Sequence, residues 1–140
     1  MAHEPPRMTL ALENINAYYG ESHILRNVSF TIEPGEVVCL MGRNGMGKTT
    51  TLKTLTGLLP ARSGTITFEG RDITQDRTDL RAKRGLAYVP QGREIIPHLT
   101  VHQNLLLGYW NRPSLTGDVS EHDAFDEVYH LFPKLTQILN

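Results

Sequence analysis

One glycine-rich stretch, GRNGMGKTT at positions 42–50, constrains this chain more than any other feature. Its first and sixth residues are glycines, and Lys48 and Thr49 follow directly, which is the spacing G-x-x-x-x-G-K-[ST] of a P-loop. Glycines let the backbone curl until successive N–H groups point inward at phosphate oxygens. A helix that begins near Lys48 adds the positive end of its dipole. The stretch therefore predicts a site that holds phosphate groups.

The side chains of this loop predict how the phosphates are held. Lys48 is a mobile point charge suited to the β and γ phosphates of a nucleotide, and the hydroxyl of Thr49 is a ligand for Mg²⁺. Backbone N–H groups from about Gly45 to Thr50 complete the cradle. The predicted nucleotide-binding residues of the loop are Gly42, Asn44, Gly45, Met46, Gly47, Lys48, Thr49 and Thr50.

The segments on either side of the loop predict a strand and a helix. The run VVCLM at 37–41 is short, continuous and apolar, which is typical of a strand buried on both faces of a parallel sheet. Cys39 lies in this run, and we expect it to be buried packing. After the loop, Leu52, Leu55 and Leu59 recur at helical spacing, and we expect Gly57 and Pro60 to end that helix.

Patterns elsewhere predict an alternation of strands and helices. We expect two antiparallel strands, Thr9 to Tyr19 and Ile24 to Ile32, around a turn at 20–22. Further strands are expected at 65–69 and 86–90, and the charged run 77–84 is expected to be the solvated face of a short helix. Capping boxes at Thr100 with Gln103 and at Ser120 with Asp123 predict two more helix starts. The second precedes an apolar stripe: Phe125, Val128, Tyr129 and Phe132.

Composition excludes several classes of protein. Lys and Arg total 14 against 15 Asp and Glu, and this balance argues against nucleic-acid binding through a basic face. A single cysteine excludes an internal disulfide and fits a reducing compartment. No apolar run approaches the ~18 residues that span a bilayer, and the first residues have no signal-peptide core. We expect a cytoplasmic chain with a disordered lead-in at 1–7 and a folded part at 8–140.

Three longer stretches resemble the N-terminal part of an ABC transporter ATP-binding subunit. They are NAYYGESHILRNVSF, GEVVCLMGRNGMGKTTTLKTLTGLLPARSGTITFEGRDIT and GLAYVPQGREIIPHLTVHQNLLLGY. The resemblance runs from about Leu10 to Phe132 and is closest to subunits that energise urea and branched-chain amino-acid uptake, with SHILRNVSF, LMGRNGMGKTT and VPQGREI favouring the urea type. It implies an α/β P-loop NTPase of the ABC nucleotide-binding type: an antiparallel β subdomain and partial core sheet to about residue 99, then the start of a helical subdomain at about 100–140.

The resemblance assigns roles to two residues outside the loop. Tyr19 resembles the A-loop aromatic that stacks on adenine, and the neighbouring Tyr18 faces the opposite side of the strand. Gln91 resembles the Q-loop glutamine, a catalytic residue whose carboxamide reaches Mg²⁺ and the attacking water. Lys48 is the other predicted catalytic residue. Met46 stands where the family usually has a smaller residue, but only its backbone N–H is needed there.

The resemblance also implies partners. An integral-membrane permease is expected to dock near Arg93, Ile95, Ile96 and Leu99, so that the chain lies peripherally on the inner face of the cell membrane. A second ATP-binding subunit is expected to form a head-to-tail dimer with this one. ATP and Mg²⁺ are the expected ligands, and no nucleic acid is expected.

Hydrolysis in this family needs parts that we do not find after Gln91. They are an apolar strand ending in Asp-Glu, an LSGGQ-like signature and a switch histidine. We therefore expect a truncated chain that binds ATP without hydrolysing it alone, since positioning and charge stabilisation dominate phosphoryl transfer. Strands from the missing half pair beside 37–41 in the family, so 37–41 and 86–90 are expected to expose apolar edges without them.

Two alternatives from other classes remain open. One is a self-contained P-loop kinase or GTPase, which is disfavoured because neither an acceptor-site motif nor a guanine-selecting NKxD occurs. The other is a binding-only module that docks on a permease or on a full-length subunit.

Overall fold

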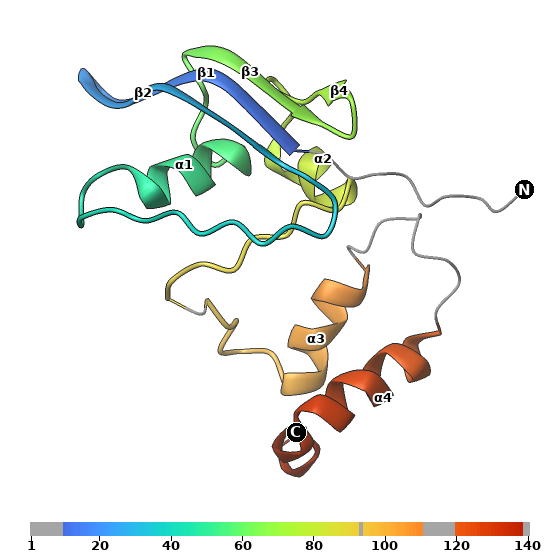
Figure 1. The fold of residues 1–140 in the computed structure, drawn as a ribbon. Helices are drawn as coiled ribbons and strands as arrows, with labels where there is room; N and C mark the ends of the chain where they lie inside the picture. The colour runs from blue at the N-terminus through green and yellow to red at the C-terminus, as the bar shows by residue number, and fades with distance from the viewer. Residues whose placement is uncertain (1–9, 93, 111–119, 139–140) are drawn as a thin grey trace, which may run out of the picture. The chain divides into compact units, whose positions relative to one another are not determined.

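The computed structural model of this chain describes residues 10–92, 94–110 and 120–138. The chain forms two compact units, Met1–Arg81 and Ala82–Asn140. The first unit contains the sheet and the glycine-rich loop, and the second contains two longer helices (Figure 1). The expected lead-in at 1–7 lies outside the described residues.

The first unit is built on a four-stranded antiparallel sheet with the order β2-β1-β3-β4. Its strands are β1 (Leu10–Tyr19), β2 (Ser22–Ile32), β3 (Ser63–Phe68) and β4 (Arg71–Asp72). The hairpin predicted around residues 20–22 is confirmed: β1 pairs with β2 from Leu10 opposite Ile32 to Tyr19 opposite Ser22. The predicted strand near 65–69 is β3, and it pairs with the other side of β1.

An irregularity in β1 explains why its apolar pattern alternates only loosely. Leu12 and Ile15 are both buried although they lie three positions apart, an offset that puts them on opposite faces of a regular strand, and the pairing register shifts between these two positions. Asn14 lies inside the shift with a φ of 51°, and its backbone N–H donates to the Ser29 hydroxyl at 2.8 Å. Such a bulge adds one residue and turns the rest of the strand over. Tyr18 and Tyr19 are placed beyond this bulge.

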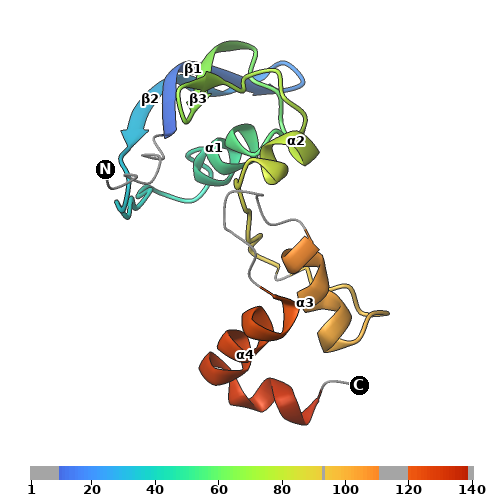
Figure 2. The same cartoon turned by 90° about the vertical axis from the view of Figure 1, so that its right-hand side faces the viewer.

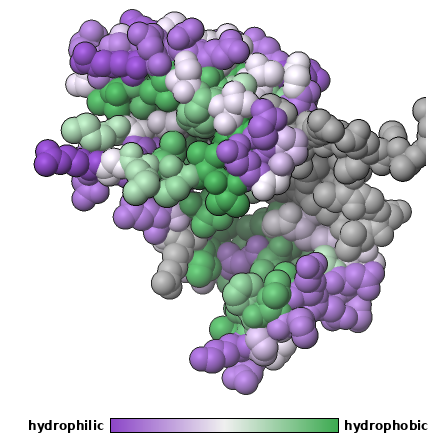
Figure 3. All heavy atoms as spheres, viewed as in Figure 1, coloured by the Kyte–Doolittle hydropathy of each residue, from purple (hydrophilic) through white to green (hydrophobic). Residues whose placement is uncertain are grey.

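The helix predicted after the loop is α1 (Lys48–Leu55), and it lies on one side of the sheet (Figures 1 and 2). Its C-cap is Thr56, and Gly57 follows with a φ of 81°, so the predicted end is confirmed. In Figure 3 hydrophilic atoms dominate the outer face of the sheet at the top, and hydrophobic atoms gather below it.

The buried face of α1 includes only part of the leucine pattern seen in the sequence. Leu52 is 42% exposed, whereas Thr54 is fully buried. The Thr54 hydroxyl donates to the Thr50 carbonyl one turn earlier at 2.9 Å, which satisfies it without a partner outside the helix. The buried face of α1 thus combines Leu55 of the leucine pattern with Thr50, Thr51 and Thr54, and Leu52 lies outside it.

Two predicted strands are corrected by the structure. Residues 37–41 and 86–90 form no strand, and within the described chain the only sheet is the four-stranded one above. Val37 is 96% exposed and Val89 87%, and Cys39 is exposed rather than buried. A strand needs a hydrogen-bonded neighbour, and no described strand lies beside either segment. The expectation that these segments expose apolar side chains when unpaired is confirmed.

A third correction concerns the charged run 77–84. It contains the predicted helix, α2 (Thr78–Lys83), and residues 77–80 and Lys83 are exposed as expected, but Arg81 is only 2% exposed. Its guanidinium donates to four backbone carbonyls, those of Thr54, Leu55, Thr74 and Asp76. Burial lowers the pKa of Arg81, while the nearby Asp76 carboxylate opposes that shift. This arginine ties the end of α1 to the segment that precedes α2.

The second unit contains α3 (Val101–Trp110), α4 (Glu121–Leu131) and a 3-10 turn, η2 (Pro133–Gln137). The predicted capping box of Thr100 and Gln103 has both of its reciprocal bonds. At the start of α4 the Ser120 hydroxyl accepts the Asp123 N–H as predicted, and it donates to the Asp123 carboxylate. Phe125 of α4 is buried, with its ring 4.8 Å from that of His102 and 6.2 Å from that of Tyr109 on α3. Phe132, predicted to continue the stripe, is 60% exposed because it lies beyond the last residue of α4.

Among the described helices, none combines the length and apolar character needed to cross a bilayer.

Candidate functional site

The glycine-rich loop curls around the side chain of Lys48. The Lys48 ammonium donates to the carbonyl oxygens of Gly42, at 2.5 Å, and Arg43, at 2.8 Å. The backbone N–H of Met46 donates back to the same Arg43 carbonyl at 3.3 Å. The Lys48 ammonium is thus held by two neutral carbonyl groups of the loop. It can exchange them for the oxygens of a phosphate, which are charged and therefore stronger acceptors.

The loop ends in a glycine that is packed against the sheet. Gly47 is the N-cap of α1 with a φ of 90°, and a Cβ atom there would lie 2.8 Å from Cδ2 of Leu25 on β2. Both the backbone conformation and the space therefore require glycine at this position. Leu25 is itself buried, so the end of the loop packs against the core of the first unit.

The start of α1 suits an anion. Its N-cap contributes no side-chain hydrogen bond, and its first turn contains no acidic residue. The N–H groups of a helix start carry partial positive charge, and an uncapped start leaves them for a ligand. This is the arrangement that the P-loop spacing predicted.

The three threonines that follow Lys48 have different surroundings. The Thr51 hydroxyl donates to the Gly47 carbonyl at 2.9 Å and is buried, so it fastens the helix to the loop. Thr50 is buried as well, whereas Thr49 is exposed. An exposed hydroxyl beside the loop lysine fits a Mg²⁺ ion that also binds the phosphates of a nucleotide. Among the described residues, no cluster of three or more His, Cys, Asp or Glu forms a separate metal site.

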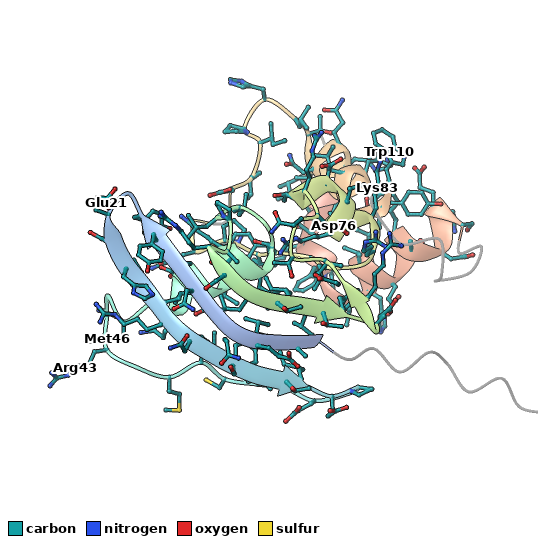
Figure 4. The ribbon with its side chains drawn as sticks, turned by 90° about the horizontal axis from the view of Figure 1, so that it is seen from above. Glu21, Arg43, Met46, Asp76, Lys83 and Trp110 are labelled. Atoms are coloured by element: carbon teal, nitrogen blue, oxygen red, sulfur yellow. The ribbon has the colours of Figure 1, made fainter. Side chains whose placement is uncertain are left out.

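Arg43 and Met46 stand on the outside of the loop. Figure 4 shows both at the margin of the first unit, with the Arg43 side chain pointing away from the sheet. Met46 is 69% exposed, so its larger side chain does not fill the space inside the loop. Asn44 and Gly45 form the turn between them, and Gly45 has a φ of 82°.

The two tyrosines at the end of β1 have distinct environments. The Tyr18 ring stacks on that of His23, with centroids 4.2 Å apart and planes at 8°, and the Arg62 guanidinium lies 5.0 Å from the Tyr18 centroid. Tyr19 is 47% exposed. Tyr18 is therefore engaged with the protein on this side, and Tyr19 presents a ring to solvent. That arrangement agrees with Tyr19 as an adenine platform, which stays a prediction.

The remaining predicted residues lie in the second unit. Gln91 is exposed in a turn at 91–92, and Ile95 and Ile96 are 66% and 43% exposed. Arg93 lies outside the described residues. The meeting of Gln91 with Lys48, which belongs to the first unit, stays a prediction.

Sequence reasoning missed two polar residues that organise the surroundings. One is Arg81, described above, and the other is Asn104, whose carboxamide bonds four backbone groups at positions 96, 99 and 100. The sequence does not identify Arg81 as a buried residue, because it lies in a run of charged residues. Asn104 offered one: it follows a capping box directly, where asparagine frequently bonds nearby backbone.

Known proteins share both the sequence and the fold of this chain. Residues 25–138 match the ABC transporter family. BraG, the high-affinity branched-chain amino acid transport ATP-binding protein of Pseudomonas aeruginosa, is 35% identical over 132 residues, covering 91% of this chain and 53% of BraG. The ribose import ATP-binding protein RbsA of Oceanobacillus iheyensis is 39% identical over 101 residues, covering 72% of this chain and 20% of RbsA.

A solved structure of the ATP-binding subunit of an ABC transporter superposes with a TM-score of 0.75 and 27% identity, covering 93% of this chain and 52% of that one. The chain thus spans only a part, 20% to 53%, of the length of these relatives. The family match includes the P-loop and disfavours the self-contained kinase or GTPase alternative. Because the match runs through both compact units and the fold agrees with it, this chain belongs to the ABC transporter family and has the fold of its ATP-binding cassette.

Proposed function

We propose that this chain is part of the ATP-binding subunit of an ABC importer, and that it binds ATP with Mg²⁺ through the loop at 42–50. The observation that carries the proposal is the position of Lys48, whose ammonium lies on the Gly42 and Arg43 carbonyls at the start of an uncapped helix. In the proposed complex the phosphates replace these carbonyls, Thr49 binds Mg²⁺, and the adenine stacks on Tyr19. The metal neutralises charge on the phosphates when it is bound.

The subunit to which the chain belongs is proposed to hydrolyse ATP in step with transport, with Gln91 near the metal and the attacking water. The 140 residues by themselves are proposed to bind without turnover. Support comes from the sequence, in which no run of four apolar residues after Gln91 leads into Asp or Glu. Without a carboxylate that positions water, most of the catalysis is lost while phosphate affinity remains.

The contact with the membrane partner is proposed to lie on the second unit. The docking segment, which we define as Arg93, Ile95, Ile96 and Leu99, is proposed to contact the cytoplasmic side of an integral-membrane permease. The exposure of Ile95 and Ile96 supports this contact, because apolar side chains in solvent favour a protein partner. The subunit would then be cytoplasmic and peripheral to the membrane, and a second ATP-binding subunit would join it head to tail.

The transported solute is proposed to be urea or a branched-chain amino acid, with urea favoured by SHILRNVSF, LMGRNGMGKTT and VPQGREI. The resemblance to BraG supports the branched-chain amino acid alternative. Uptake of labelled urea and labelled leucine by cells that lack this gene would separate the two, since only the true solute would fail to accumulate.

Binding is tested by thermal unfolding of the 140-residue chain with ATP and Mg²⁺. A ligand that binds only the folded state raises the unfolding midpoint, and at one hundred times its Kd it adds about 2.7 kcal/mol to the free energy of unfolding. We expect the rise in the original chain and in the control Lys53→Ala, in the last turn of α1, but not in Lys48→Ala. AMP, which lacks the β and γ phosphates, should give little rise.

Two results would contradict this function. An ATP-induced rise that Lys48→Ala leaves intact would show that the loop is not the site. ATP turnover by the 140 residues that Lys48→Ala abolishes would show that they hydrolyse as well as bind.

A further inference from the structure

One side chain holds the docking segment in shape. The carboxamide oxygen of Asn104 on α3 accepts the backbone N–H of Ile96 at 3.0 Å, and its nitrogen lies 3.2 Å from the Ile96 carbonyl oxygen. The same nitrogen lies 3.2 Å from the Leu99 carbonyl oxygen and 3.0 Å from that of Thr100. All four contacts are internal to the second unit.

These contacts need an asparagine. The side-chain amide pairs with the N–H and the C=O of Ile96 together, as a backbone peptide group of a neighbouring strand would. Aspartate has no N–H to give to the three carbonyls, and its charge would repel them. Glutamine is one methylene longer and would displace the amide from them.

Hydrogen bonds join a turn at residues 96–99 to the first turn of α3. The Leu99 N–H donates to the Ile96 carbonyl at 3.1 Å, so residues 96–99 form a closed turn. The Thr100–Gln103 capping box then fixes the junction with α3 through bonds of 2.9 and 3.1 Å. The backbone N–H and C=O groups of Ile96 and Leu99 are satisfied in this way, and the side chains of Ile95 and Ile96 remain in solvent.

We infer that Asn104 is a positioning residue for permease docking, since it holds Ile96 and the turn behind it in the conformation that presents the apolar side chains. The inference rests on the proposed docking segment. A turn ordered before contact spares the entropic cost of ordering its backbone during binding. Asn104 also joins the segment to α3 through these hydrogen bonds.

The test uses the 140-residue chain and the permease subunits of the same transporter, reconstituted in lipid nanodiscs. Three quantities are measured: the hydrogen-exchange rate of the Ile96 amide, the affinity for the nanodisc and the affinity for ATP with Mg²⁺. The variants are Asn104→Ala, Asn104→Asp, and the control Gln103→Ala, which weakens the capping box of the same helix. Ile96→Asp reports separately whether the segment docks at all.

For Asn104→Ala we expect the Ile96 amide to exchange roughly tenfold faster, since it loses its acceptor. We also expect roughly tenfold weaker nanodisc binding and unchanged ATP affinity. Asn104→Asp keeps the acceptor for Ile96, so it should protect that amide and still weaken docking. Gln103→Ala should leave both the exchange rate of the Ile96 amide and the affinity for the nanodisc unchanged.

The inference is overturned if Asn104→Ala leaves nanodisc affinity unchanged, or if Gln103→Ala weakens it equally, because helix fraying would then explain the loss. A different result rejects the proposed function. If Ile96→Asp binds the nanodisc as the original chain does, the docking segment is wrongly assigned, whatever Asn104 does to the turn.

Discussion

The Nη1 atom of Arg81 lies 2.7 Å from the carbonyl oxygen of Leu55, the last residue of α1. The last carbonyls of a helix have no partner within it, and a cation there also interacts favourably with the helix dipole. Arg81 therefore completes the P-loop helix from a segment more than twenty residues away in the sequence.

Replacing Arg81 with Met should lower the free energy of unfolding by about 2–4 kcal/mol, because four backbone carbonyls, two of them in buried bonds, would lose a charged donor. Urea unfolding followed by circular dichroism measures this change. Arg77→Met is the matched control, since the Arg77 side chain is 83% exposed and pairs with Asp79 on the surface. Its cost should stay within ~0.5 kcal/mol. Equal costs for the two variants would show that the Arg81 network does not stabilise the fold.

Changing Tyr19 to Ala should weaken ATP binding about tenfold, since stacking of a base on an aromatic ring contributes roughly 1–3 kcal/mol. The free energy of unfolding should change little, because the ring is 47% exposed. Tyr18→Ala should lower the free energy of unfolding and leave ATP affinity nearly unchanged, because the Tyr18 ring packs on His23 and beneath Arg62. Calorimetric titration with ATP and Mg²⁺, paired with urea unfolding, separates the two effects. If Tyr18→Ala is the variant that loses ATP affinity, the assignment is reversed.

Features set by neighbouring residues could be predicted from the sequence. The loop and α1 follow from glycines, a lysine and a helix start within nine positions. The turn of the β1–β2 hairpin, where Tyr19 pairs with Ser22, and the caps at Thr100 and Ser120 likewise depend on residues three positions apart. In each case the partners that satisfy the backbone are themselves local.

Features that depend on residues distant in the sequence could not be predicted in this way. Residues 37–41 have the composition of a buried strand, but burial depends on neighbouring strands that the described chain does not place there. Arg81 and Asn104 differ from solvated residues only in which carbonyls the fold brings to them. Thr54 is buried although it is polar, because a hydroxyl bonded within its own helix can be buried at little cost.

Replacing Gly47 with Ala should damage both the fold and the loop. The new methyl group would meet Leu25 Cδ2 at 2.8 Å, and a φ of 90° strains any residue with a Cβ. We expect the free energy of unfolding to fall by about 1–3 kcal/mol and ATP affinity to fall with it. Adding Leu25→Ala removes the clash but not the strain, so ATP affinity should recover only in part. Full recovery in the double variant would show that space alone excludes alanine.

The carboxylate of Asp72 predicts an acid-dependent contribution to stability. It accepts the Thr74 hydroxyl at 2.6 Å and the Thr74 N–H at 2.8 Å, and these two bonds hold its pKa below the ordinary value of 3.8. A depressed pKa means that the folded chain binds this proton less readily than the unfolded chain. The stabilisation is therefore present above pH 3.8 and is lost as the pH falls through the lower folded pKa.

Asp72→Asn tests this contribution, because an amide keeps an oxygen acceptor but carries no titrating charge. The difference in free energy of unfolding between the original chain and the variant is measured in urea from pH 7 to pH 3. We expect the original chain to be the more stable at neutral pH and its advantage to shrink below pH 3.8. A difference that stays constant over this range would mean that Asp72 titrates alike in the folded and unfolded chains, and that the Thr74 bonds do not favour its charged form.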